Sequence, residues 1–212
     1  MHHIYRTEAI ILSSRPSGEA GKYLTVLSKD YGVLKIEAAA VRKNDSKLRQ
    51  SIQDYSVANI SFVRGKTGNK LVNASFIANF FYDVNQPKLL KSLTKVFRLI
   101  EKMIVDEEKD VTVFDLLIET GEILKDKNKQ NKTQSDILKN DSEYKDFLEA
   151  LEIVVVYKIL AGLGYVSGDG EYNFIISEKI DDDLLVRVKN LPKKDKENII
   201  RLINQAINES HL

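Results

Sequence analysis

The chain has 212 residues, enough for one large domain or two small ones, and 43% of them are apolar, which is ample for hydrophobic cores. It contains no cysteine, which excludes disulfides and thiolate metal sites. Its apolar runs are too short to cross a bilayer, and the start has no apolar signal core. We therefore expect a soluble cytoplasmic protein with no membrane partner.

The whole-chain charge of +1 hides two oppositely charged segments. Residues 1–82 carry twelve Lys and Arg against six Asp and Glu, a net charge of +6, whereas residues 83–212 carry twenty against twenty-five, a net charge of −5. A compact basic module on an acidic chain is typical of a polyanion-binding surface. The charge boundary predicts two domains, covering residues 1–82 and 83–212.

The basic segment shows the period-two alternation of β-strands, interrupted by Gly, Ser, Asp and Asn at the spacing of a small antiparallel barrel or sandwich. Residues 15–22 have the composition of a loop, and residues 64–70 that of a glycine hairpin turn. The predicted strands, five in number, cover residues 5–12, 23–28, 33–41, 55–63 and 70–76.

After Pro87 the apolar spacing becomes that of amphipathic helices. Residues 126–141 are polar and rich in charge, which indicates a linker or a mobile loop. The β-branched run within residues 153–161 could also be a buried strand, but its length and flanking spacing favour a helix. The predicted helices cover residues 88–108, 112–125, 143–163 and 192–209.

Motifs of catalysis and cofactor binding are weak in this chain. Gly65-Lys66-Thr67 resembles the end of a phosphate-binding loop, but Ile60 occupies the position of the required first glycine. Residues 162–164 are better explained as a helix C-terminus than as a dinucleotide site. The acidic runs at 106–108 and 181–183 are better explained as solvated helix ends than as metal sites. We expect no enzyme activity, no metal and no cofactor.

Basic side chains in the β module are the strongest candidate site. Four of them lie in one short connection, residues 42–49, and others flank the predicted loops after the first and fourth strands. In a five-stranded Greek-key barrel those two loops border the face that holds single-stranded nucleic acid. The candidate DNA-binding residues are Arg15, Lys22, Lys35, Arg42, Lys43, Lys47, Arg49, Arg64, Lys66 and Lys70.

Three tyrosines could add stacking surfaces to these cations. Tyr23, Tyr31 or Tyr55 would stack on bases if its ring faces outward. Against this interpretation stands the simpler alternative of a solvated basic surface with ordinary tyrosines in the barrel core. Loop charge alone leaves the two interpretations evenly matched.

Several segments, taken in order, resemble the RecO family of bacterial DNA-repair and recombination mediator proteins. Two of them are Tyr5-Arg-Thr-Glu-Ala-Ile-Ile-Leu12 and Leu24-Thr-Val-Leu-Ser-Lys-Asp-Tyr-Gly32, with Gly18-Glu19 between them. Further matching pieces are residues 41–49, 53–55 and 71–72. Residues 157–165 look like part of the family's helical domain, so the resemblance covers most of the chain.

The resemblance implies an α+β architecture, with an N-terminal five-stranded OB-fold barrel followed by an all-α helical domain. It also implies binding of single- and double-stranded DNA and annealing of complementary strands. With the partner RecR, such a protein helps to load RecA onto DNA covered by single-stranded DNA-binding protein. These activities imply a cytoplasmic, nucleoid-associated location.

In the family, the helical domain receives the apolar C-terminal tail of single-stranded DNA-binding protein. That tail is acidic, so we expect an apolar groove edged with positive charge. Many members also carry a four-cysteine zinc site after the segment that matches Gly164-Tyr165. Residues 166–177 contain no cysteine, which excludes that zinc site, and we expect a short hairpin in its place.

The expected mechanism involves no bond making or breaking. Basic loops would hold two strands by their phosphates and reduce their repulsion, without reading sequence. Arg42, Lys43, Lys47 and Arg49 are the first choices for this role. Two alternatives remain open: an adaptor that binds only proteins, and an RNA-binding OB protein.

Overall fold

The computed structural model describes residues 3–43, 46–81, 87–104, 111–130, 141–167 and 170–210. The chain forms two compact units, Met1–Asp83 with Ile100–Phe114, and Val84–Leu99 with Asp115–Leu212. Within the described ranges, every helix is too short or too polar to span a bilayer.

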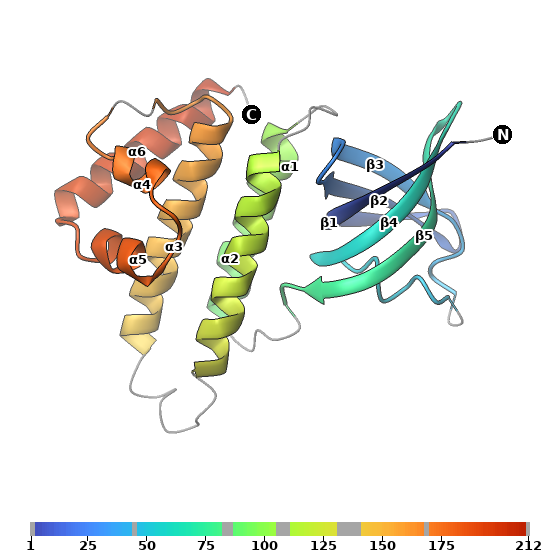
Figure 1. Ribbon diagram of the computed structural model, residues 1–212, viewed down its shortest axis with the longest axis horizontal. Helices are drawn as coiled ribbons and strands as arrows, with labels where there is room; N and C mark the ends of the chain where they lie inside the picture. Colours follow the sequence, from blue (N-terminus) through green and yellow to red (C-terminus); the bar gives the residue numbers. More distant parts are fainter. Residues whose placement is uncertain are drawn as a thin grey trace. The chain divides into compact units, whose positions relative to one another are not determined.

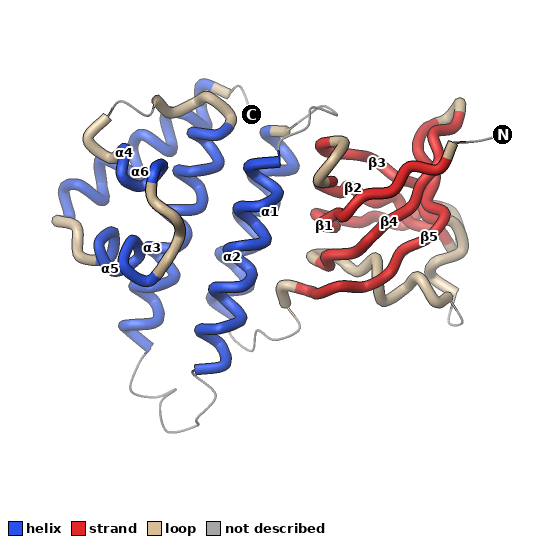
Figure 2. The backbone as a smooth tube through the Cα atoms, viewed as in Figure 1, coloured by secondary structure: helices blue, strands red, loops and turns tan. Residues whose placement is uncertain are grey.

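The first unit contains a closed five-stranded barrel in the order β1-β2-β3-β5-β4 (Figures 1 and 2). The pair β3 and β5 is parallel, and the other neighbours are antiparallel. This arrangement confirms the predicted OB-fold class. The strands are β1 (Ile4–Ser17), β2 (Gly21–Ser28), β3 (Gly32–Ala38), β4 (Ser56–Gly65) and β5 (Gly68–Asn79).

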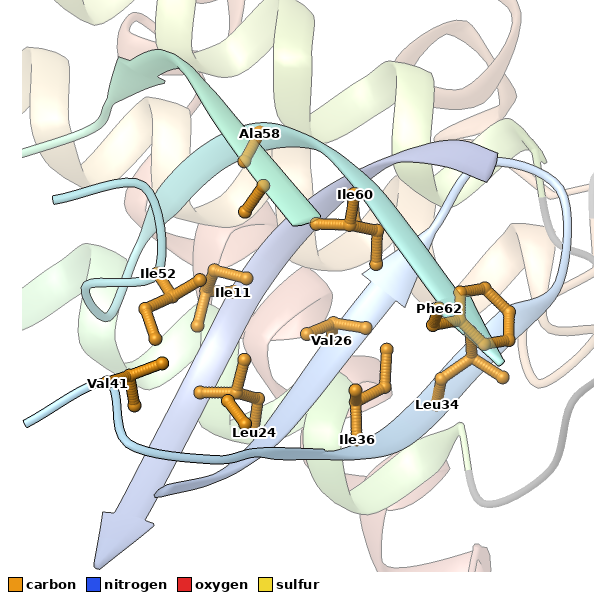
Figure 3. Packing of buried hydrophobic residues seen from close by; sticks show 13 residues of the cluster. Ile11, Leu24, Val26, Leu34, Ile36, Val41, Ile52, Ala58, Ile60 and Phe62 are labelled. Carbon is orange, nitrogen blue, oxygen red and sulfur yellow. The ribbon is translucent and has the colours of Figure 1, made fainter. Parts of the chain in front are cut away.

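The apolar and polar residues that alternate in the sequence lie inside and outside the barrel, respectively, because successive side chains of a strand point to opposite faces. In β3, Leu34 and Ile36 are buried while Lys35 between them is exposed. Figure 3 shows the resulting core, in which Phe62 and Leu34 lie at one end and Val41 and Ile52 at the other.

The hairpin between β1 and β2 differs from the predicted loop. Residues 15–22 were expected to form a loop, but the strands continue, with Arg15 opposite Tyr23 and Ser17 opposite Gly21. The turn itself is confined to residues 18–20. Gly18 has φ +56°, and a Cβ on Gly21 would lie 2.8 Å from the Ser17 carbonyl oxygen, so glycine permits this tight turn.

The hairpin between β4 and β5 is confirmed but is shorter than expected. Gly65 pairs with Gly68, which leaves Lys66 and Thr67 as the turn, and both strands extend around it. Two strand ends also differ from the prediction. Strand β5 continues to Asn79 rather than ending at residue 76, and β3 ends at Ala38 rather than at residue 41. Ala40, with φ +57°, has the left-handed conformation just after that end.

In the second unit, helix α3 packs against α4, α5 and α6 (Figure 1). Its apolar stretch over residues 153–161 is helical and mostly buried, as its length predicted. The helices are α1 (Pro87–Met103), α2 (Val111–Gln130), α3 (Asp141–Gly162), α4 (Asn173–Ser177), α5 (Asp182–Lys189) and α6 (Lys193–Glu209), of which α1 and α2 are divided between the units.

Two helix boundaries differ from the predictions. Helix α2 continues to Gln130, so the predicted loop at 126–141 cannot begin at residue 126. Residues 131–140 of that loop lie outside the described residues. Helix α1 ends at Met103, before the predicted end at residue 108, and the acidic run 106–108 also lies outside the described residues. Polar composition alone did not distinguish a solvated helical turn from a loop.

The expected hairpin at 166–177 is wrong, because helix α4 occupies residues 173–177. Before it, α3 ends as predicted near Gly164, whose φ is +79°, with Tyr165 N donating to the Leu160 carbonyl at 2.8 Å. After it, Asp181 caps α5 by accepting from Leu184 N at 2.9 Å. The run 181–183 therefore lies at a helix end, as expected.

Candidate nucleic-acid interface

A row of side chains crosses four strands on the outer surface of the barrel. Strand pairing places Arg15 opposite Tyr23, Tyr23 opposite Glu37, and Glu37 opposite Lys70. Arg15 and Lys70 are exposed, and the ring of Tyr23 is 41% exposed. The Arg15 guanidinium lies 5.4 Å from the centre of the Tyr23 ring, within cation–π range. The row offers an aromatic surface between two cations, with one carboxylate among them.

Lys35 belongs to the same side of the sheet. It is exposed on β3 opposite Thr25, two residues from Glu37, so its side chain points outward with that of Glu37. Its carbonyl accepts a hydrogen bond from Asn69 Nδ2 at 3.3 Å, which links β3 to the start of β5. The structure thus brings together three of the predicted cations on one face.

Of the three predicted stacking tyrosines, only Tyr23 faces outward. Tyr31 packs edge-on against Phe62 at 5.6 Å, as part of the barrel core. Tyr55 lies edge-on to Phe81 at 4.3 Å and has φ +68°. The simpler alternative of a core tyrosine therefore describes Tyr31 better than a stacking role, whereas Tyr55 packs on Phe81.

The connection between β3 and β4, drawn in tan in Figure 2, brings a second group of cations together. Arg42 N donates to the Ala20 carbonyl at 2.8 Å, which fixes the start of the connection to the β1–β2 turn. Arg42 and Arg49 then line a cavity of about 430 Å³ together with Lys22. Three predicted cations from two separate segments therefore line the same cavity.

Lys43 and Lys47 lie on the same connection but do not line this cavity. Both are exposed. Short turns hold the backbone around them, since Ser46 N donates to the Lys43 carbonyl and Arg49 N to the Ser46 carbonyl, each at 3.2 Å. These lysines extend the positive surface beside the cavity.

The β4–β5 hairpin carries the remaining predicted cations, Arg64 and Lys66. The Arg64 guanidinium lies 5.1 Å from the centre of the Tyr5 ring and 6.0 Å from that of Tyr31. Arg64 thus covers the aromatic end of the barrel core, while Lys66 is exposed in the two-residue turn. The ten cations therefore form three groups rather than one.

Sequence reasoning missed the polar residues that support Lys22. Lys22 Nζ donates to Ser14 Oγ at 3.0 Å, and Ser14 Oγ donates in turn to Asp54 Oδ1. Pairing of β1 with β2 brings Ser14 near Lys22, and no local sequence motif indicates that these two residues lie close together. Among the described residues, no group of three or more His, Asp or Glu side chains is arranged to hold a metal ion.

The second unit contains an apolar groove of about 600 Å³, bordered by α1, α3 and α6. Its lining includes Val96, Ile153 and Ile200, the last of which is 39% exposed. Among the described residues, two lysines and two glutamates line it. Lys95 Nζ lies 3.1 Å from Glu152 Oε1, and the other two are Lys145 and Glu149. The groove is therefore apolar as expected, but its charged border is mixed rather than positive.

Residues 1–80 match the family model described as "Recombination protein O N terminal". This match covers the whole β-barrel, including every predicted cation. Among curated proteins, the chain is 31% identical over 118 residues to the "DNA repair protein RecO" of Thermodesulfovibrio yellowstonii. That alignment covers 55% of this chain and 47% of the relative.

Other relatives carry the same name. The "DNA repair protein RecO" of Dehalococcoides mccartyi is 28% identical over 135 residues, which cover 64% of this chain and 51% of the relative. That of Heliobacterium modesticaldum is 34% identical over 77 residues, 36% of this chain and 28% of the relative. The chain spans about half the length of the first two of these relatives.

Proposed function

Because its N-terminal module, residues 1–80, belongs to the RecO family, we propose that the protein acts in DNA repair and recombination by binding DNA through its barrel. The observation that carries this proposal is the row Arg15–Tyr23–Glu37–Lys70 across the outer face of a closed OB-fold barrel. Cations at both ends would contact phosphates, and the exposed Tyr23 ring would stack on a base.

We propose that the cations of the connection 42–49 and of the β4–β5 hairpin extend this surface to a second strand. Neutralising phosphates on two complementary strands lowers their repulsion, so that their bases can pair. Contacts to phosphates carry no sequence information, so annealing would not depend on sequence. A protein with this activity would work in the cytoplasm with the nucleoid, and would assist RecA loading together with RecR.

Salt titration of binding to a fluorescent single-stranded DNA oligonucleotide tests the proposal. We expect tight binding at low salt and a steep fall as salt rises, because each neutralised phosphate contributes about −0.7 to the slope of log K against log salt. Duplex DNA and an RNA oligonucleotide of the same sequence serve as competitors. Absence of binding at low salt would leave the adaptor interpretation, and a strong preference for RNA would favour an RNA-binding protein.

For the groove bordered by α1, α3 and α6, we propose the acidic, apolar-ended tail of single-stranded DNA-binding protein as the occupant. The apolar lining with the exposed Ile200 fits the apolar end of such a tail, and Lys145 can attract its carboxylates. Glu149 and the pairing of Lys95 with Glu152 oppose that attraction. Binding should therefore rest more on apolar contact than on charge.

The mixed border leads to a specific prediction. Replacing Glu149 with lysine should tighten binding of an acidic peptide with an apolar C-terminus by about three- to tenfold, because the change removes repulsion and adds attraction. Replacing Lys145 with glutamate should weaken binding by a similar factor. Peptide anisotropy checks both variants, with Lys194→Glu, an exposed change outside the groove, as the control. Equal affinities for all three variants would exclude this groove as the tail site.

A further inference from the structure

The basic surface contains a cavity between the start of β2 and the β3–β4 connection. It has a volume of about 430 Å³ and is lined by Lys22, Arg42 and Arg49, with Gln53 beside them. Val41 and Ile52, which are 2% and 1% exposed, also line it. Its lining thus combines cations with the apolar end of the barrel core (Figure 3).

Hydrogen bonds hold two of these cations in place. Arg42 is fixed by its backbone bond to Ala20, and its Nη1 donates to the Gly18 carbonyl at 3.5 Å. Lys22 is held by Ser14, which donates onward to Asp54. Because these side chains are positioned before any ligand arrives, less conformational entropy is lost on binding.

The charges that line the cavity favour a doubly negative group. Among the described residues, the charged side chains that line the cavity are three cations, and Asp54, which reaches Lys22 only through Ser14, does not line it. An internal phosphodiester carries one negative charge, whereas a terminal phosphate carries nearly two at neutral pH, because its second pKa is about 6. An internal phosphate also needs an open groove with two exits for the strand, while a terminal phosphate needs only one.

We propose that this cavity binds the terminal phosphate of a nucleic-acid strand, so that the protein distinguishes a phosphorylated end from the strand interior. Lys22, Arg42 and Arg49 would contact the phosphate oxygens, and the Gln53 amide would donate a further hydrogen bond. Val41 and Ile52, which are almost fully buried, would form the floor beneath the bound phosphate. This inference rests on the proposed DNA binding and adds the part of the strand that is recognised.

The test uses the whole chain and three oligonucleotides of one sequence, with a 5′-phosphate, a 3′-phosphate or hydroxyls at both ends. We expect one phosphorylated end to bind about tenfold more tightly than the hydroxyl oligonucleotide, as charge-assisted hydrogen bonds to a dianion allow. Comparison of the 5′-phosphorylated with the 3′-phosphorylated oligonucleotide shows which end of the strand the cavity binds. The preference should shrink at about pH 5.5, where the terminal phosphate becomes a monoanion.

The variant Arg49→Gln should abolish the preference for a phosphorylated end. The variant Lys66→Gln, on the β4–β5 turn outside the cavity, should weaken the binding of all three oligonucleotides equally and leave that preference unchanged. Equal binding of all three oligonucleotides by the parent protein would overturn the inference and leave the proposed DNA binding intact. If none of the three oligonucleotides bound, the result would instead contradict the proposed DNA binding and therefore this inference as well.

Discussion

Replacing Arg42, Lys43, Lys47 and Arg49 together with alanine is expected to lower the affinity for single-stranded DNA by about 100-fold, and to reduce the salt slope by about 3. All four side chains are exposed on one connection, and two of them line the cationic cavity. Their removal takes away phosphate contacts without emptying the core. Anisotropy over a salt series measures both quantities, and the annealing rate of complementary strands should fall in parallel.

A matched control removes the same charge elsewhere. Lys193, Lys194, Lys196 and Arg201 lie on α6, outside the barrel, so their replacement with alanine should change binding much less. If both quadruple variants lost affinity equally, the effect would reflect net charge rather than a site. If neither lost affinity, the connection 42–49 would not contact DNA, and binding would rest on the row through Tyr23 alone.

Replacing Lys158 with methionine is expected to destabilise the helical unit by about 1–3 kcal/mol, because two backbone carbonyls at the end of α4, one of them partly buried, lose a charged donor. Lys158 on α3 donates through Nζ to the Ile176 carbonyl at 2.8 Å and to the Glu178 carbonyl at 2.6 Å. These carbonyls belong to the end of α4, where a cation is favourable. Lys158 thus anchors the end of α4 to α3.

The effect of this replacement should depend on pH. Burial lowers the pKa of Lys158, and the nearby Glu119 and Glu178 only partly oppose it. Between that lowered pKa and about 10.5 the folded state binds fewer protons than the unfolded state, so this group adds stability as pH rises through the window. The methionine variant lacks this gain. Its deficit should therefore be somewhat larger at about pH 9.5 than at about pH 7.

Chemical denaturation followed by far-UV circular dichroism measures both effects. Lys194→Met, at an exposed position of α6, is the control and should leave the transition unchanged. A Lys158→Met variant with the parent's midpoint would show that α4 is held by apolar packing alone, through buried residues such as Ile175. The DNA affinity of the variant separates a local loss of structure from a loss of the barrel.

Local sequence pattern was enough to predict a small antiparallel β module, either a barrel or a sandwich. Strict alternation, as at Leu34, Lys35 and Ile36, specifies which face of a strand is buried, and this requires no knowledge of partners. The tight β4–β5 turn was also readable, because glycine acts on its own backbone neighbourhood. The OB-fold class follows from such local signals together with the resemblance.

The sequence by itself determined the fold class, the position of the basic module and the candidate cations. The tertiary structure alone decided how those cations group, because Lys22 meets Arg42 and Arg49 only through strand pairing and the bond from Arg42 N to Ala20. It also decided which tyrosine faces outward, and that a lysine rather than a hairpin organises residues 173–178. Such contacts join residues distant along the chain, so no local periodicity encodes them.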